Sequence, residues 1–246
     1  MAKAAIIIPA RWGATRFPGK PLHVISGKPL IQHVWERCQR AKSVGRVIVA
    51  TDDMRIAEAA FGFGAEVALT SKRHPSGTDR AAEVAANLRN VGIIVNVQGD
   101  EPLLDPRLVD RLIAALVSRV DCEMATAGCP LDDADVGNPN CVKVVCDVDG
   151  RALYFSRSPI PADRDGEVRP VRWRHLGIYA YRRRFLLDFV RWRPTPLELS
   201  EKLEQLRALE HGARILVVKT KRSGPGVDTP GDVALVEREM KLRGQR

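Results

Sequence analysis

The sequence predicts a doubly wound α/β fold built on a mostly parallel sheet. Runs of β-branched residues such as Ile6–Ile8 are typical of strands buried on both faces. Segments with helical spacing of apolar residues separate these runs, and glycine- or proline-rich loops follow them. Right-handed crossovers bring the carboxyl ends of parallel strands to one edge, so we expect the ligand site at that edge.

The first loop reads as an anion-binding loop. Ala4–Leu22 begins as a buried strand, which Pro9 ends, and continues with three cations spaced by two glycines: Arg11, Gly13, Arg16, Gly19 and Lys20. It departs from the P-loop pattern, because five residues separate the glycines and Pro21 stands where a metal-binding hydroxyl is needed. Any metal is therefore expected elsewhere. The plainer interpretation is a surface turn with solvated cations.

Alternating helices and strands continue the pattern. Helical spacing covers Pro29–Lys42 and the segment that ends at Phe61, and short strands are predicted at Arg46–Ala50 and Glu66–Leu69. A polar loop, residues 71–80, then leads into an alanine-rich helix. Ser76, Thr78 or Asp79 is a suitable helix cap, and Ser76, Gly77 and Thr78 are also suited to hydrogen-bonding a base or ribose.

A carboxylate pair follows the next predicted strand, Gly92–Val97. The loop reads Gln98-Gly99-Asp100-Glu101-Pro102. By itself this is an ordinary polar turn. It falls on the same sheet edge as the cationic first loop, however, and Mg²⁺ typically combines one or two carboxylates with substrate phosphates. The two loops together predict a site for a metal and a polyphosphate.

The second half of the chain predicts further strands and helices, one of which carries candidate ligand-binding residues. A helix is expected over Pro106–Val120, and Trp173–Tyr181 reads as a strand with His175 and Tyr179 on one face. A lone histidine is more often structural, but this pair is equally suited to lining a substrate cleft. Strands are also expected at Glu123–Pro130, Cys141–Cys146 and Ile215–Lys219, helices at Leu197–His211 and after Gly226-Val227-Asp228-Thr229-Pro230. Within Leu197–His211, Glu204 and Gln205 are adjacent and are expected to diverge.

Composition limits the class of protein. The 246 residues are enough for one large domain, 45% hydrophobic and 28% charged residues are ordinary for a soluble protein, and no apolar run approaches the ~20 residues of a membrane helix. We expect a cytoplasmic protein without a membrane partner. The five cysteines form no C-x-x-C pair, which favours buried reduced thiols over disulfides or zinc.

The net charge of +9 leaves two interpretations open. One is binding of anionic small molecules; the other is a basic RNA-binding module. No recognisable nucleic-acid-binding motif accompanies the charge, and much of the excess lies in residues 164–193. Composition alone does not choose between them.

Separated motifs carry a family resemblance over essentially the whole chain. They are I-I-P-A-R at 7–11, R-F-P-G-K-P-L at 16–22, A-T-D-D at 50–53, S-G-T-D-R at 76–80, V-N-V-Q-G-D-E-P at 95–102, Y-F-S-R at 154–157, R-H-L-G-I-Y at 174–179, L-E-Q-L-R at 203–207 and G-V-D-T-P at 226–230. With these motifs in this order, the sequence resembles the 3-deoxy-manno-octulosonate cytidylyltransferase family.

The resemblance implies a function and an architecture. It implies a Rossmann-like, glycosyltransferase-A-like nucleotidyltransferase fold over 1–246, with 141–196 as an insertion for sugar-acid binding and dimer contacts. It implies Mg²⁺-dependent transfer of CMP from CTP to the anomeric hydroxyl of 3-deoxy-D-manno-octulosonate, with release of pyrophosphate, as a step toward lipopolysaccharide. An 8-amino variant or a neuraminic acid is the alternative acceptor. The implied partners are these substrates and a second copy of the chain, with no nucleic acid.

The resemblance also assigns residues. Arg11, Arg16, Lys20, Ser76 and Gln98 match the nucleotide side, and Asp100 and Asp228 the magnesium carboxylates. Arg11, Lys20, Asp100 and Asp228 are the expected catalytic group. Arg157, His175, Tyr179, Glu204 and Gln205 match the sugar-acid side. The sequence shows no obvious general base, so we hypothesise that the metal lowers the pKa of the sugar hydroxyl directly.

Overall fold

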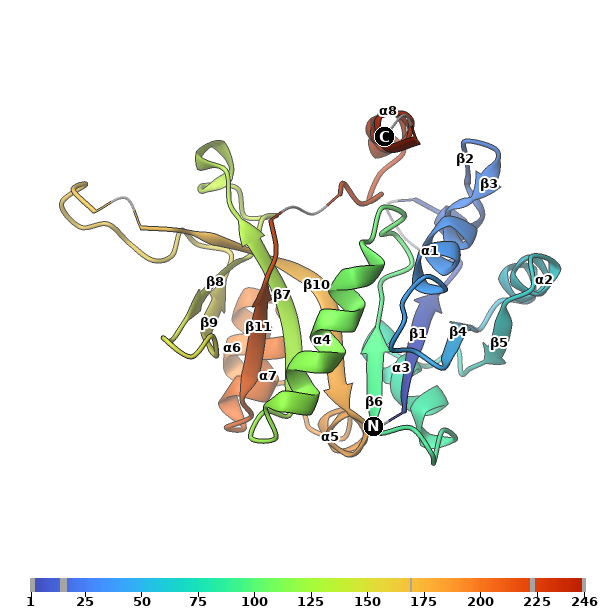
Figure 1. The fold of residues 1–246 in the computed structure, drawn as a ribbon, viewed down its shortest axis with the longest axis horizontal. Coiled ribbons are helices and arrows are strands. Elements are labelled where there is room, and N and C mark those ends of the chain that lie inside the picture. Colours follow the sequence, from blue (N-terminus) through green and yellow to red (C-terminus); the bar gives the residue numbers. More distant parts are fainter. Residues whose placement is uncertain (1–2, 14–16, 169, 222–223, 245–246) are drawn as a thin grey trace.

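The computed structural model describes residues 3–13, 17–168, 170–221 and 224–244. Its main sheet has the strand order β11-β7-β10-β6-β1-β4-β5, with β8 and β9 attached beside β10 (Figure 1). These strands are β1 (Ala4–Ala10), β4 (Arg46–Thr51), β5 (Glu66–Leu69), β6 (Ile93–Asn96), β7 (Met124–Pro130), β8 (Lys143–Cys146), β9 (Ala152–Ser156), β10 (Trp173–Arg182) and β11 (Ile215–Lys219). A small hairpin pairs β2 (Val24–Ile25) with β3 (Lys28–Pro29).

The sheet is mostly parallel, as the sequence predicts. β1 lies between β4 and β6 and is parallel to both, and β11 is parallel to β7. β10 is the antiparallel member and separates β6 from β7. The parallel strands consequently end at one edge of the sheet, where the loops after β1 and β6 lie next to each other.

Helices cover both faces of the sheet. Ile6 and Ile8 of β1 belong to one core and Ile7 to the other, so the strand is buried on both faces as predicted. The first core contains residues of α1 (Leu30–Cys38), α2 (Met54–Gly62) and α4 (Pro106–Ser118). The second contains residues of α3 (Gly77–Ala86), α5 (Arg183–Phe189) and α7 (Gln205–Glu210).

The predicted single helix Leu197–His211 is wrong, because two short helices replace it. α6 (Pro196–Glu201) ends before Lys202, which has a left-handed backbone with φ of 54°, and α7 follows. Leu203 and Leu206 are buried in the second core, whereas Leu199 is 53% exposed. Burial of the later leucines therefore sets a new helix direction, and the change of direction turns Glu204 and Gln205 toward the sheet.

A third, smaller core brings the end of the chain back to its beginning. Val227 and Val236 pack there with Phe17 and Leu103, so α8 (Asp232–Gly244) and the loop before it lie over the first loop. Figure 1 shows α8 beyond the edge of the sheet at which β1 ends. Cys38, Cys122, Cys129 and Cys141 are buried, as predicted, and Cys146 is half-buried. Within the described residues, no helix is long and apolar enough to cross a membrane.

Candidate active site

Three charged residues from distant segments meet at the carboxyl edge of the sheet. Lys20 lies in the 3₁₀ turn η1 (Lys20–Leu22), Asp100 follows β6, and Asp228 precedes α8. The Lys20 Nζ lies 2.6 Å from Asp100 Oδ2 and 3.8 Å from Asp228 Oδ1, and it donates to the Val227 carbonyl at 2.9 Å. Two carboxylates thus converge on one cation.

Glycines allow these segments to approach each other. A Cβ on Gly99 would lie 3.1 Å from the Pro9 carbonyl oxygen, and one on Gly226 would lie 3.3 Å from the Asp100 carbonyl oxygen. The same Asp100 carbonyl accepts a hydrogen bond from the Val227 amide at 2.9 Å. The loops after β1, after β6 and before α8 are therefore packed backbone to backbone.

Glu101 lies beside this cluster and has a different environment. Burial raises the pKa of its carboxyl to about 7, and the neighbouring charges of Asp100 and Asp228 act in the same direction, while Arg174 and Lys20 oppose them. A carboxyl with that pKa is partly protonated near neutral pH. Glu101 therefore carries only part of a negative charge at that pH.

A cavity of about 400 Å³ opens next to Lys20 and Asp100. It brings together four of the five residues predicted for the nucleotide, Arg11, Lys20, Ser76 and Gln98, and the two predicted magnesium carboxylates, Asp100 and Asp228. The remaining predicted residue, Arg16, lies outside the described residues. Ser76 is the N-cap of α3, since its hydroxyl accepts from the amides of Thr78 and Asp79 at 3.1 and 3.2 Å. The rim thus combines cations, the Ser76 hydroxyl and the amino terminus of α3.

His175 is held as a neutral ring on the second face of the sheet. Its Nε2 lies 2.9 Å from the Thr126 hydroxyl, which donates to the Ile178 carbonyl at 2.8 Å. The threonine has a single proton, so the histidine is the donor in their contact. Burial lowers the pKa of His175 to about 3. Its ring contacts those of Tyr179 and Phe155, at centroid distances of 5.4 and 5.0 Å.

Glu204 and Gln205 both reach this region, although adjacent residues were expected to diverge. Ser76 Oγ lies within hydrogen-bond distance of both Glu204 Oε1, at 3.0 Å, and Asp79 Oδ2, at 2.7 Å, and the Thr78 hydroxyl donates to Glu204 Oε2. Tyr179 donates its phenolic proton to Gln205 Oε1 at 3.1 Å. Glu204 is the N-cap residue of α7 and Gln205 its first residue, so a turn and a helix orient them separately.

Two buried polar atoms near this cluster have no hydrogen-bond partner among the described residues. They are Oδ1 of Asn96, on β6, and Nε2 of Gln205. Asn96 is fully buried, and its amide nitrogen lies 3.5 Å from the Thr78 hydroxyl. One atom is an acceptor and the other a donor, so this region retains capacity for polar contacts.

Arg157 is placed apart from these residues by its contacts. Its guanidinium donates to the backbone carbonyls of Glu201, Pro139 and Lys202 at 2.7, 2.9 and 3.4 Å. Its backbone amide also donates to the Glu201 carboxylate at 2.9 Å. In this conformation, Arg157 ties the end of β9 to the end of α6.

A larger cavity of about 950 Å³ lies on the other side of the Gln98–Glu101 loop. Its walls include the start of α4, part of β10 and the end of β11. Several of its cations already have partners in the protein: Arg107 with Asp105 at 3.2 Å, Lys219 over the Trp173 ring at 4.7 Å, and Arg243 with the Leu103 carbonyl at 3.1 Å. The charged groups predicted from the sequence converge on the smaller cavity instead.

Comparison with known proteins decides the family. The family model described as cytidylyltransferase matches residues 5–215. A protein of Geobacter sulfurreducens named 3-deoxy-manno-octulosonate cytidylyltransferase is 51% identical over 96% of this chain and 98% of its own length. This chain belongs to the 3-deoxy-manno-octulosonate cytidylyltransferase family. A relative of the same name from Pseudomonas syringae pv. tomato is 52% identical over 98% of this chain and 99% of its own length.

Solved structures agree with the cytidylyltransferase family. The structure of CMP:2-keto-3-deoxy-manno-octonic acid synthetase complexed with CTP matches with a TM-score of 0.95 and 42% identity, over 98% of this chain and all of that chain. A 4-diphosphocytidyl-2C-methyl-D-erythritol synthase from Anaerococcus prevotii has a TM-score of 0.64 at 14% identity, and so shows the shared fold alone. The predicted fold and family are confirmed.

Sequence reasoning missed part of this cytidylyltransferase site. Asn96 and Arg207 fall within the quoted motifs, but the sequence predicts no role for either residue. For Thr78 it predicts a helix cap or a contact with the nucleotide, whereas the hydroxyl contacts Glu204. The position of Asn96 is the feature that could have identified it, because Asn96 precedes Gln98 by two residues on the strand that carries the carboxylate loop.

Proposed function

We propose that this protein transfers CMP from CTP to the anomeric hydroxyl of 3-deoxy-D-manno-octulosonate and releases pyrophosphate, a step of sugar activation for lipopolysaccharide. The observation that carries the proposal is the convergence of Lys20, Asp100 and Asp228 beside a cavity lined with cations and other polar side chains. The names of the closely related proteins and of the CTP-bound structure supply the substrates.

The residues at the carboxyl edge fit a bound Mg²⁺. The carboxylates of Asp100 and Asp228 both lie next to the Lys20 ammonium group. If Lys20 moved to contact the polyphosphate, a metal cation would be suited to bind between these two carboxylates. The described residues contain no group of three or more His, Cys, Asp or Glu arranged to hold a metal. Two carboxylates are nevertheless sufficient for Mg²⁺ when substrate phosphates complete its coordination. When bound, Mg²⁺ neutralises phosphate charge and lowers the pKa of a nearby hydroxyl.

The protein's own residues supply positioning and charge. Lys20 and Arg11 lie on the cavity wall, where they neutralise the triphosphate, and Gln98 lines the same cavity. Such transfer requires alignment and charge stabilisation more than covalent chemistry. His175 has a pKa of about 3 and already donates to Thr126, so we assign it to holding the sugar-acid side rather than to proton removal.

A pyrophosphate-release assay tests the proposal. Purified protein with CTP and Mg²⁺ is offered 3-deoxy-D-manno-octulosonate, its 8-amino variant or N-acetylneuraminate, in separate reactions. We expect release with the first acid, and none without acceptor or with ATP, GTP or UTP in place of CTP. Faster pyrophosphate release with either of the other acids would identify that acid as the acceptor in place of 3-deoxy-D-manno-octulosonate. No release with any acid, together with salt-sensitive RNA binding, would favour the RNA-binding alternative.

We also propose a cytoplasmic homodimer that uses the segment 141–196. Leu153 on β9 is 62% exposed, and Val168 and Val171, in the segment between β9 and β10, are 78% and 68% exposed. Figure 1 shows the hairpin of β8 and β9 projecting from the main sheet. Multi-angle light scattering is expected to give twice the 27.2 kDa chain mass. A Leu153→Asp, Val171→Asp variant is expected to give the monomer mass, and an unchanged dimer would place the interface elsewhere.

A further inference from the structure

A buried arginine lies behind the Glu204 carboxylate. Arg207 is only 7% exposed and belongs to α7, three residues after Glu204. Its Nε and one terminal nitrogen donate to the two oxygens of Glu198 at 2.7 and 2.6 Å, a bidentate pair. The same terminal nitrogen lies 3.6 Å from Glu204 Oε1. The guanidinium therefore stands between two carboxylates.

Other contacts fix this arginine in place. Its remaining terminal nitrogen donates to the Trp192 carbonyl at 3.3 Å, and its guanidinium carbon lies 4.8 Å from the centre of the Phe189 ring. Glu198 is itself held in a capping box with Thr195 at the start of α6. A side chain with so many partners has little rotational freedom, so its charge is presented to Glu204 at a fixed point.

Glu204 requires such a partner. Burial raises the pKa of its carboxyl, and the hydrogen bonds from Thr78 and Ser76 and the charge of Arg207 oppose this effect. The nearby negative charge of Asp79 also raises the pKa of Glu204. The two carboxylates share one hydroxyl group, because Ser76 Oγ lies 2.7 Å from Asp79 Oδ2 and 3.0 Å from Glu204 Oε1. One hydroxyl proton cannot serve two carboxylates at once. Among the described residues, Arg207 forms the only ion pair with Glu204.

We propose that Arg207 is a positioning residue. Its ion pair with Glu198 fixes its guanidinium, and the guanidinium holds the Glu204 carboxylate next to Ser76 and Thr78. In this orientation Glu204 is ready to contact the sugar-acid acceptor. This inference rests on the proposed function, which places Glu204 on the acceptor side. Ser76 keeps its capping contacts with the amides of α3 whatever Glu204 does. Loss of Arg207 should therefore weaken acceptor binding more than CTP binding.

The test compares Arg207→Lys with Arg207→Met and a control, Arg183→Met. Arg183 is also partly buried on this side of the sheet, but its guanidinium donates to the backbone carbonyls of Ala85 and Ala86, at 2.7 and 2.9 Å. In Arg207→Lys a single ammonium cannot reproduce the bidentate pair, and we expect KM for the sugar acid to rise about tenfold while KM for CTP changes less than about twofold. The control is expected to change neither KM value.

The pH profile gives a second readout that a purely structural role would not move. Without the arginine charge the pKa of Glu204 rises further, so the acid limb of kcat/KM for the sugar acid moves to higher pH in Arg207→Met and less in Arg207→Lys. The ionisable groups facing Glu204 are Asp79 on α3, Tyr179 and Tyr181 on β10, and Arg207 with Glu198 behind it. Both tyrosine pKa values are raised by burial, so the tyrosines stay neutral over this range.

Calorimetric binding separates the possible failures. If wild-type protein binds no sugar acid in the presence of CTP and Mg²⁺, the proposed function fails and this inference fails with it. If the wild type binds and Arg207→Lys binds equally well, only the positioning role fails. An equal rise of both KM values, or an unmoved acid limb in Arg207→Met, also overturns it. Should Arg207→Met not fold, Thr78→Val replaces it, and a smaller selective rise of the sugar-acid KM is expected.

Discussion

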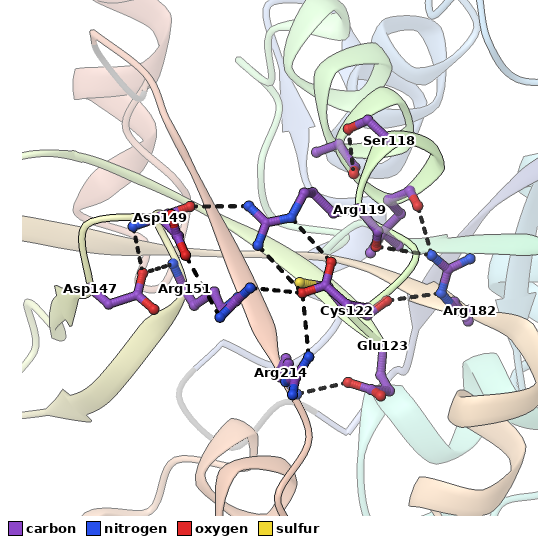
Figure 2. Close-up of polar contacts among 12 residues, drawn as sticks. Ser118, Arg119, Cys122, Glu123, Asp147, Asp149, Arg151, Arg182 and Arg214 are labelled. Carbon is purple, nitrogen blue, oxygen red and sulfur yellow. Dashed lines mark hydrogen bonds and ion pairs between the residues drawn. The ribbon is translucent and has the colours of Figure 1, made fainter.

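The two edges of the sheet both carry clusters of charged side chains, but the ratio of cations to carboxylates is opposite in the two clusters. At the amino edge, where β7 and β11 begin, the Asp121 carboxylate accepts from Arg119 at 3.1 Å and Arg151 at 3.0 Å, with Arg214 at 3.5 Å. Figure 2 shows the side chains of Arg119, Arg151 and Arg214 converging at this edge. Arg182 adds hydrogen bonds to the carbonyls of Cys122 and Leu116, each at 2.8 Å. At the carboxyl edge the balance is reversed, with Asp100 and Asp228 directed at the single ammonium of Lys20.

This difference separates a structural cluster from a binding site. Around Asp121, cations from the end of α4, the start of β9 and the start of β11 surround one carboxylate, so the cluster links three segments. Around Lys20, the carboxylates outnumber the ammonium group, and a cavity adjoins them. A charged cluster that adjoins a cavity is typical of a site that binds a ligand.

Removing a carboxylate at the carboxyl edge should have the largest effect on activity. Asp228→Asn is expected to reduce kcat about 100- to 1000-fold at saturating Mg²⁺, because the metal that would neutralise the reacting phosphate loses one charged ligand. Pyrophosphate release measures it. Asp133→Asn, in an exposed 3₁₀ turn, is the matched control. Near-normal turnover of Asp228→Asn would remove Asp228 from the metal site.

Removing the ammonium should separate the two substrates. Lys20→Ala is expected to lower kcat/KM for CTP about 30- to 100-fold, as a charged contact to phosphate is lost. The sugar-acid affinity, measured calorimetrically, should change less than about threefold. Lys28→Ala serves as control, since Lys28 only pairs with Glu36 at 2.7 Å on the surface. An equal loss for both substrates would contradict a role confined to CTP.

Neutralising Glu101 should stabilise the protein, which is the opposite of what loss of a structural carboxylate does. The folded-state pKa of Glu101, about 7, lies above its ordinary value of 4.5, so its contribution favours folding at low pH and is lost as pH rises through 7. The free energy of unfolding of Glu101→Gln is expected to exceed that of the wild type by about 1–2 kcal/mol at pH 8 and to equal it near pH 4. Urea titration at both pH values measures this. A lower stability at pH 8 would show that the charged form is favoured.

Neutralising Asp121 should give the smallest effect, confined to stability. Hydrogen bonding from Arg119 and the nearby charges of Arg119 and Arg151 lower the pKa of Asp121 to about 2, below the ordinary 3.8. Its contribution is therefore complete above pH 4 and is lost as pH falls through 2. Asp121→Asn should lower the thermal midpoint slightly at pH 7, converge with the wild type near pH 2, and leave kcat unchanged. A changed kcat would mean that the two edges are coupled.

The sequence by itself determined the fold class, the family and the edge of the sheet at which charged loops meet. These features depend on local patterns: three consecutive isoleucines make β1, and glycines flank the loops that follow β1 and β6. It also placed Ser76 among the candidates for capping α3, which the structure confirms. Local backbone preference and hydrophobic periodicity are properties of short segments, so they can be read from the sequence.

Only the tertiary structure decided how distant residues combine. Periodicity extended one helix through Glu204, whereas burial of Leu203 and Leu206 breaks it at Lys202 and turns Glu204 toward Ser76, 128 residues away in sequence. The same is true of Arg207, whose partner Glu198 lies on a different helix. Side-chain pairing across segments depends on packing of the whole core, and packing is not a property of any single segment.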